Sequence, residues 1–312
     1  MKIHMPGKTF KGHLPSLTTQ QADLSARLRE HVQMLGGDIG ERNVYKPEKL
    51  EYAAKYIEHV FARLGYETGK QEYEAEHVTV RNIDVNVPGT THPDEIVVVG
   101  AHYDSVMGAP GANDNASGVA ATLEIARMLH DKKLSRTIRY VAFVNEEPPF
   151  FQSDKMGSVV YARRCKERGE KIVAMLTPET IGYYSDEPGS QKYPSILGWF
   201  YPKVGNFITF VGESDSGALV SKCVGLFRQY AQFPSEGGAA PKSIEGIGWS
   251  DHWSFSRCGY PALMITDTAP FRYPHYHTER DTPEKCDYDR MARVVEGVAR
   301  VVEHLANEES HK

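Results

Sequence analysis

The sequence predicts an α/β domain in which helices cover both faces of a mainly parallel β-sheet. Between residues 95 and 176, short apolar segments rich in β-branched residues alternate with segments of helical period. This alternation is typical of parallel sheets built from strand–helix–strand units. The run Val97-Val98-Val99 is apolar without interruption, which indicates a strand buried on both sides. A composition with 40% hydrophobic and 25% charged residues excludes a disordered or fibrous chain.

The first elements are an arm and a capped helix. Residues 1–17 are punctuated by Pro and Gly and are expected to form an extended arm. Residues 18–312 are expected to fold as a single domain, because no repeat or low-complexity linker divides them. A hydroxyl side chain caps the start of a helix, and glycine favours its end. A helix is therefore expected from Thr18-Thr19 to Gly36-Gly37.

The remaining elements follow from the spacing of apolar residues along the chain. A period near 3.6 residues predicts a helix, whereas alternation or a short continuous apolar run predicts a strand. On this basis strands are expected over residues 78–87, 95–100, 137–144, 172–176, 207–211 and 261–265. Helices are expected over residues 47–64, 117–130, 157–168, 216–231 and 287–305.

Two segments without clear periodicity are expected to surround a pocket. Residues 184–206 and 233–250 are rich in Pro, Gly, Ser and aromatic residues, which is typical of loops. The triplet Ser250-Asp251-His252 resembles a nucleophilic triad in composition only, because three consecutive side chains cannot form that geometry. It is expected to be a loop at the pocket edge that positions Trp249 and Trp253 near a substrate.

Composition excludes several classes of function. The formal net charge of −5 and the lack of a basic run argue against nucleic acid as a partner. The four cysteines are far apart and form no zinc-ribbon pattern. No stretch reaches the roughly 20 apolar residues of a membrane span. The first residues lack the apolar core of a signal peptide, so a chain that begins at Met1 is expected in the cytoplasm. If an export segment was removed from it, the protein is expected in the periplasm or outside the cell.

Ionisable residues follow three of the expected strands. His102 and Asp104 follow the first, Glu146-Glu147 the second and Glu179 the third. In an open α/β sheet, ligands bind beyond the carboxyl ends of the strands, so these groups are expected to converge on one edge. Asp114 joins them from the loop that leads into the next helix.

Taken singly, each of these residues has an ordinary structural explanation. His102 could be a partly buried histidine, Glu146-Glu147 a solvated surface pair, and Asp114 a turn residue that caps the following helix. Their convergence changes the argument, because carboxylates pressed together in a cleft raise one another's pKa unless a cation compensates. One imidazole with several carboxylates suits zinc and, with weaker selectivity, manganese or cobalt.

A further ligand is expected near the C-terminus, in the segment that contains His277. Two histidines and three carboxylates would suit two ions about 3.5–4 Å apart, with one carboxylate bridging them. Asp104, two residues beyond His102, could accept the free ring N–H and so orient the imidazole. Glu146, next to a ligand but directed elsewhere, is then free to act as a general base.

Several motifs together resemble one known family, the M28 family of zinc aminopeptidases, which also contains carboxypeptidases and glutaminyl cyclases. The resemblance spans about residues 95 to 285 in the family's order. The motifs are His102-Tyr103-Asp104, residues 111–118, Glu146-Glu147, Met156-Gly157-Ser158, Ser250-Asp251-His252, Tyr276-His277-Thr278 and Asp281-Thr282.

The resemblance implies a three-layer α/β/α sandwich around a mixed, mainly parallel sheet, and a site with two zinc ions. Asp114 would bridge the ions, with His102 and Glu179 on one ion and Glu147 and His277 on the other. Co²⁺ or Mn²⁺ are possible substitutes for zinc. The family usually has Asp at the position of Glu179, and the longer side chain could change metal preference.

The implied activity is removal of N-terminal residues from peptides. The water would be activated by two zinc ions, Glu146 would act as the general base, and the Tyr276 hydroxyl would stabilise the tetrahedral intermediate. The substrates would be peptides with a free N-terminus. Two alternatives stay open at this point: a glutaminyl cyclase-like acyltransferase with one zinc, and a non-catalytic module that keeps the peptidase fold.

Overall fold

The computed structural model describes residues 1–308. Its helices are α1 (Thr19–Val32), α2 (Pro47–Arg63), α3 (Ser117–Leu129), α4 (Gly157–Glu167), α5 (Gly217–Tyr230), α6 (His252–Arg257), α7 (Ala269–Arg272) and α8 (Tyr288–Asn307). Its strands are β1 (Gly69–Ala75), β2 (Val78–Val87), β3 (His92–His102), β4 (Arg136–Phe143), β5 (Lys171–Glu179), β6 (Ile208–Glu213), β7 (Ser235–Ala240) and β8 (Ala262–Thr266).

All eight strands form one mixed sheet in the order β1-β2-β4-β3-β5-β8-β6-β7. The four central strands β4, β3, β5 and β8 run parallel to one another. The pairs β1/β2, β2/β4 and β6/β8 are antiparallel, and β7 pairs parallel with β6 at the edge. The predicted mixed, mainly parallel sheet is therefore confirmed.

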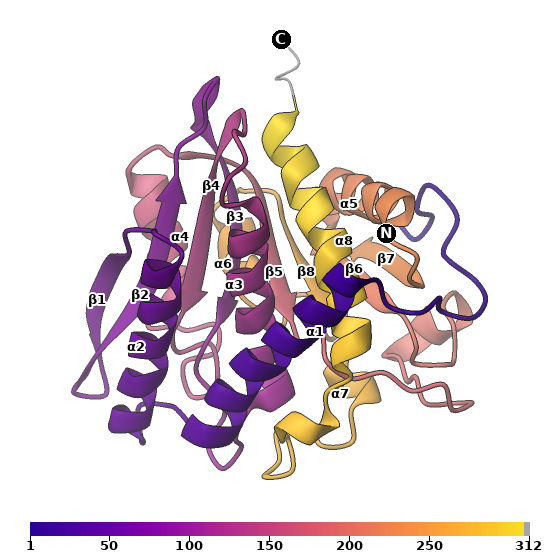
Figure 1. The fold of residues 1–312 in the computed structure, drawn as a ribbon, viewed down its shortest axis with the longest axis horizontal. Helices are drawn as coiled ribbons and strands as arrows, with labels where there is room; N and C mark the ends of the chain where they lie inside the picture. Colours follow the sequence, from indigo (N-terminus) through magenta and orange to yellow (C-terminus); the bar gives the residue numbers. More distant parts are fainter. Residues whose placement is uncertain (309–312) are drawn as a thin grey trace.

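Helices cover both faces of this sheet, which makes a three-layer sandwich (Figure 1). α1, α2, α3, α5 and α8 lie on one face, and α4 and α6 lie on the other. The two faces have separate apolar cores, and the alternation of β3 shows why: Val97 and Val99 pack into one core and Val98 into the other. The continuous apolar run in the sequence reflects this burial on both sides.

Two of the strands were not predicted from the sequence. β1 has the sequence GKQEYEA and lies at a sheet edge with mostly exposed or half-exposed side chains, so it lacks an apolar signal. β7 lies inside residues 233–250, which we expected to be loop, and its sequence SEGGAA contains no β-branched residue. Both segments are strands because a neighbouring strand pairs with them, and tertiary pairing can override weak intrinsic preference.

The expected end of the first helix at Gly36-Gly37 is also wrong. Thr18 does cap α1, with a reciprocal bond to Gln21, but a π-helical segment, η1 (Gln33–Ile39), continues through both glycines. Gly36 lies against the loop before α3, and a Cβ atom on it would come within 2.5 Å of the Ala112 Cα. The glycine therefore permits close packing rather than helix termination.

The arm runs along the edge of the sheet instead of joining a layer. Residues 1–17 form no helix, and Lys2 makes an antiparallel bridge with Ala239 in β7. In Figure 1 the indigo arm passes outside β7 and α5 before it enters α1. Within residues 1–308, no helix is long and apolar enough to cross a membrane.

Candidate metal centre

The carboxyl ends of the parallel strands bring the predicted residues together in two groups. The first group contains His102 at the end of β3, Asp114 from the segment before α3, and Glu179 at the end of β5. His102 Nε2 lies 3.3 Å from Asp114 Oδ1 and 3.2 Å from Glu179 Oε2. All three side chains are buried.

The second group shares Asp114 with the first. His277 Nε2 lies 3.1 Å from Asp114 Oδ2 and 3.2 Å from Glu147 Oε2. Asp114 therefore directs one carboxylate oxygen toward each group, and His102 and His277 lie on opposite sides of it. This is the arrangement that a bridging carboxylate requires.

Glu146 and Asp104 lie beside these groups without belonging to either. Glu146 Oε2 is 3.9 Å from His102 Nε2. Asp104 Oδ1 is 3.5 Å from His102 Nδ1, which is long for a hydrogen bond. The stronger contacts of Asp104 are with the main chain, because its carboxylate accepts the N–H groups of Glu146 and Glu147, both at 3.1 Å. Asp104 thus orients the segment that follows β4 as well as facing His102.

Asp281 fixes the segment that carries Asp114. Its two carboxylate oxygens accept the main-chain N–H groups of Asn113 at 2.8 Å and Asp114 at 3.0 Å. The Tyr273 hydroxyl donates to the same carboxylate. In the sequence Asp281 belongs to a motif, but nothing local indicates its role, because its partners lie 167 and 168 residues away.

Glu179 is held by two donors that the sequence did not reveal. Ser250 Oγ donates to Glu179 Oε2 at 2.7 Å, and Asn115 Nδ2 donates to the same oxygen at 3.2 Å. The expectation that residues 250–252 form a pocket-edge loop is wrong for these side chains, since Ser250, Asp251 and His252 are all fully buried. Of the three, Ser250 contacts the metal centre, through its hydrogen bond to Glu179.

Arg42 stabilises the loop between His102 and Asp114 from below. Its side chain is fully buried. Its guanidinium donates to the carbonyl groups of Tyr103, Pro110 and Gly111 in this loop. Further bonds to main-chain carbonyls connect it to the segment that follows α1. A buried guanidinium with satisfied donors adds positive charge near the carboxylates and restrains the loop.

The electrostatic environment attracts cations. Burial, with the negative charge of nearby Asp114, raises the pKa of Glu147 to about 7 and that of Glu179 to about 7. Burial alone would lower the pKa of His277, but its contacts with Asp114 and Glu147 raise it to about 10. The pKa of His102 is likewise raised, against the effect of burial, by Glu179 and Glu146. Protons and metal ions are alternative partners for this concentration of negative charge.

The donor atoms fit divalent metal ions. Zinc–ligand distances near 2.0–2.1 Å in a tetrahedral site place two ligand atoms about 3.3 Å apart, and the four imidazole–carboxylate separations within the two groups are 3.1–3.3 Å. Glu147 Oε1 and His277 Nε2 are buried atoms that make no hydrogen bond within residues 1–308. Buried polar atoms without partners are costly, and coordination would satisfy them.

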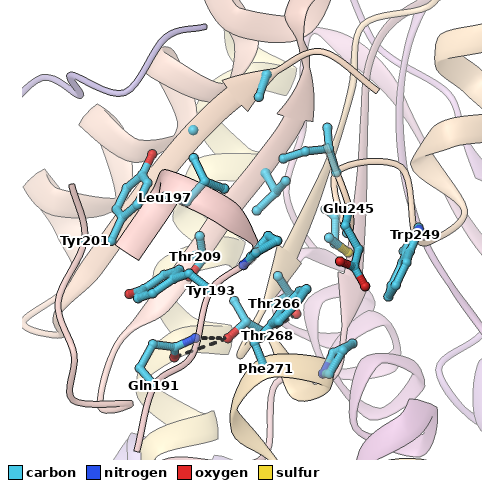
Figure 2. A pocket seen from close by; sticks show the side chains of 18 of the residues that line it. Gln191, Tyr193, Leu197, Tyr201, Thr209, Glu245, Trp249, Thr266, Thr268 and Phe271 are labelled. Carbon is cyan, nitrogen blue, oxygen red and sulfur yellow. Dashed lines mark hydrogen bonds between the residues drawn. The ribbon is translucent and has the colours of Figure 1, made fainter. Parts of the chain in front are cut away.

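An apolar pocket adjoins the centre, because it is lined by Glu179 of the first group and by Tyr276, the neighbour of His277. Its floor comes from β6, β8 and β7, and both expected loop regions contribute walls. Figure 2 shows Tyr201 and Leu197 on one side and Glu245 and Trp249 on the other. No Lys or Arg is among the described residues that line it. This pocket, which we call the side-chain pocket, is thus suited to an apolar group, and the charged side chains among its described lining residues are those of Glu179 and Glu245.

Tyr276 lies at the junction of the pocket and the metal centre. Its ring stacks on His277, with centroids 3.8 Å apart and an interplanar angle of 18°. Burial, with the charges of Asp114 and Glu147, raises the pKa of its hydroxyl, which therefore stays protonated and can donate a hydrogen bond. Trp249 lines the pocket as expected, whereas Trp253 is not among its lining residues and packs under Arg257.

The sequence is similar to one protein family and to individual proteins. The model of peptidase family M28 matches residues 82–302. An uncharacterised Escherichia coli protein, YfbL, is 37% identical over 281 residues, covering 87% of this chain and 85% of the relative. Leucine aminopeptidase 1 of Trichophyton equinum is 28% identical, covering 84% of this chain and 69% of its own.

The fold is similar to those of solved structures with two kinds of activity. A zinc aminopeptidase from Bacillus subtilis aligns with a TM-score of 0.70 at 16% identity, covering 92% of this chain and 96% of its own. A glutaminyl cyclase from Bacteroides thetaiotaomicron aligns with a TM-score of 0.69 at 18% identity, covering 91% of this chain and 98% of its own. At these identities the similarity concerns the fold alone.

Proposed function

Because the chain belongs to peptidase family M28, a family of peptide hydrolases, we propose that it is a two-metal aminopeptidase that removes the N-terminal residue from peptides. The observation that carries the proposal is the shared carboxylate of Asp114, which joins two potential three-residue metal sites. The apolar pocket beside these sites supplies a place for the side chain of the residue to be removed.

Five residues would hold the metal ions. His102 and Glu179 would bind one ion, Glu147 and His277 the other, and Asp114 would bridge them. Zinc is the proposed metal, with cobalt or manganese as substitutes. Two such ions supply Lewis acidity, which makes water more acidic and polarises the scissile carbonyl group.

Glu146 is the proposed general base. It is buried at the site, lies 3.9 Å from His102, and belongs to neither three-residue group. Its carboxylate would take a proton from the attacking water and give it to the leaving amine, as general acid–base catalysis requires. Asp104 would keep it in position through the bonds to the main chain of Glu146 and Glu147. The Tyr276 hydroxyl would donate to the oxyanion that forms.

Recognition of a free N-terminus follows from the charges around the site. Glu146 and Glu179 would attract the positively charged α-ammonium of a peptide, and Glu245 adds negative charge at the pocket. A carboxypeptidase would instead need a cationic side chain for the terminal carboxylate, and the described residues that line the pocket include none.

The experiment measures hydrolysis after chelation and reloading with zinc, cobalt or manganese. Aminoacyl p-nitroanilides and dipeptides are the substrates, and N-acetylated versions are the controls. We expect activity to need metal, to reach its maximum near two ions per chain, and to disappear with the acetylated substrates. Metal-loaded protein that leaves every unblocked substrate intact would disprove the proposal.

Metal stoichiometry also separates the rival functions. One zinc per chain together with cyclisation of N-terminal glutamine would show a glutaminyl cyclase, whose fold this chain shares. Failure to bind any of the three metals would indicate a non-catalytic module.

A further inference from the structure

We propose that the N-terminal arm closes the far end of the side-chain pocket, and that Ile3 limits the length of the apolar N-terminal side chain that this pocket accepts. The inference rests on the proposed function, because it concerns the substrate of the same site. It identifies the preferred substrates as peptides whose first residue has a large aromatic or extended apolar side chain.

One antiparallel bridge holds the arm against the edge of the sheet. The Lys2 N–H donates to the Ala239 carbonyl at 2.7 Å, and the Ala239 N–H donates to the Lys2 carbonyl at 2.9 Å. This antiparallel bridge places the first residues beside β7, at the edge of the sheet. The arm is therefore positioned by main-chain pairing.

Alternation along the arm directs its side chains to opposite faces. Met1 and Ile3 line the pocket. Lys2, between them, extends to the other face, where its Cδ would lie 3.6 Å from a Cβ atom on Gly217 of α5. Consecutive side chains in an extended chain point to opposite sides. The pairing of Lys2 with β7 therefore directs the Ile3 side chain into the pocket.

The arm is fastened beyond the pocket by α5. The Arg228 guanidinium donates to the carbonyl groups of Met5, Pro6 and Gly7. The Ser235 N–H donates to Thr9 Oγ1 at 2.8 Å. Packing is close as well, because a Cβ atom on Gly225 would come within 3.0 Å of Pro6 Cγ. These contacts hold the arm in one place and make it a wall of defined position.

The pocket is long compared with an ordinary side chain. It begins at Glu179 on β5 and crosses β8 and β6 to β7 and the arm. Three strand spacings separate β5 from β7, which is about 14 Å. In Figure 2 the indigo arm passes on the Tyr201 side, opposite Trp249. A methyl side chain at the metal end would leave most of this length unfilled, whereas an extended aromatic group would approach the arm.

The test is a series of p-nitroanilides whose first residue is alanine, leucine, phenylalanine or biphenylalanine, with zinc-loaded protein. Ile3→Trp shortens the pocket, and we expect it to lower kcat/KM for the biphenylalanyl substrate by about 100-fold through KM, but that for the alanyl substrate by less than about 3-fold. Deletion of residues 1–7 opens the pocket to water and should reduce the preference for phenylalanyl over alanyl by about 10-fold.

Lys8→Trp is the matched control, because Lys8 is an exposed arm residue outside the pocket. We expect it to leave the whole series unchanged. Equal effects of Ile3→Trp on every substrate, or none on any, would overturn the inference while leaving the proposed function intact.

A binding measurement distinguishes failure of the proposed function from failure of the arm inference. If the wild-type protein hydrolyses no aminoacyl substrate, calorimetric binding of biphenylalaninol and alaninol still measures pocket length. Tighter binding of biphenylalaninol that Ile3→Trp abolishes would support the arm inference without the activity. Equal binding of the two alcohols would overturn it.

Discussion

The metal centre and the side-chain pocket adjoin each other but are built in opposite ways. In the metal centre, buried ionisable groups are held by specific hydrogen bonds, such as that from Ser250 to Glu179. The pocket is mostly apolar, and distant segments assemble it, from the arm to Phe271. Substitutions in the centre should therefore change the hydrolysis of all substrates alike. Substitutions in the pocket should change hydrolysis according to the side chain of the substrate's first residue.

The largest expected effect tests the first half of this comparison. Glu146→Gln keeps the size of the side chain but removes the base, and general acid–base catalysis contributes about 10²–10⁴-fold. We expect kcat to fall by about 10³-fold for alanyl, leucyl and phenylalanyl substrates alike, with bound zinc unchanged. Steady-state kinetics and metal analysis of the same sample measure both quantities.

Glu245→Gln is the control for loss of a carboxylate, since Glu245 lies at the pocket and outside both metal groups. It should change KM more than kcat. Near-normal hydrolysis by the Glu146 variant, or a loss confined to one substrate, would contradict the assignment.

A second prediction concerns His252, which connects the two regions. Its Nε2–H donates to the carbonyl group of Ile247, which lines the pocket. His252 also lies two residues after Ser250, whose hydroxyl donates to Glu179. Full burial lowers its pKa to about 4, from an ordinary value of 6.5. At a pH between these two pKa values, His252 is protonated in the unfolded chain but not in the folded protein. Stability should therefore be lost as pH falls from 6.5 through about 4, by up to about 3 kcal/mol.

Denaturant unfolding of wild type and His252→Gln at a series of pH values isolates this contribution. Because glutamine does not titrate in this range, the stability difference between the two proteins should shrink as the pH falls. A difference that stays constant from pH 7 to pH 4 would show that His252 is not the titrating group.

The same contrast explains what could be predicted from the sequence. Three residues of the metal centre, His102, Glu147 and Glu179, lie at or just after the ends of successive parallel strands, and such a chain must bring them to one edge. Their supporting partners left no local signal, because Ser250 and Asp281 act across 71 and 167 residues. β7 and the position of the arm gave no signal either, since the Gly-rich strand forms by pairing with β6 and the arm is placed by its contacts with β7 and α5.

A third prediction tests support of the metal centre from beneath. Ser250→Ala removes the shorter of the two hydrogen bonds to Glu179 Oε2 and leaves the one from Asn115. Loss of a partner that orients a ligand typically costs 10–100-fold in metal affinity. We expect zinc affinity to fall by about 30-fold at one of the two sites, measured by competition with a chromophoric chelator.

Ser256→Ala in α6 is the matched control, because the Ser256 hydroxyl is buried and makes no hydrogen bond within residues 1–308. It should leave zinc affinity unchanged. Weakening of both sites equally by Ser250→Ala would show that the variant disturbs the whole centre rather than Glu179.

The smallest expected effect comes from the rim of the pocket. Trp249 is 39% exposed, and its ring stacks on Phe271 with centroids 6.4 Å apart. A contact between the Trp249 ring and an aromatic substrate side chain would contribute about 1 kcal/mol, so Trp249→Ala should raise KM for phenylalanyl substrates about 5-fold. The alanyl substrate should be unaffected, because a methyl group does not reach the rim.

Trp199→Ala is the control, because Trp199 is 88% exposed and is not among the residues that line the pocket. If Trp249→Ala lowered kcat for both substrates equally, Trp249 would act with the metal centre, through its neighbour Ser250 and the bond to Glu179. The boundary between the two regions would then lie farther into the pocket, between Trp249 and Phe271. An effect on KM alone, for the aromatic substrate only, would place that boundary between Trp249 and Ser250. Trp249 would then contribute to substrate selectivity, and the next residue, Ser250, to support of the metal centre.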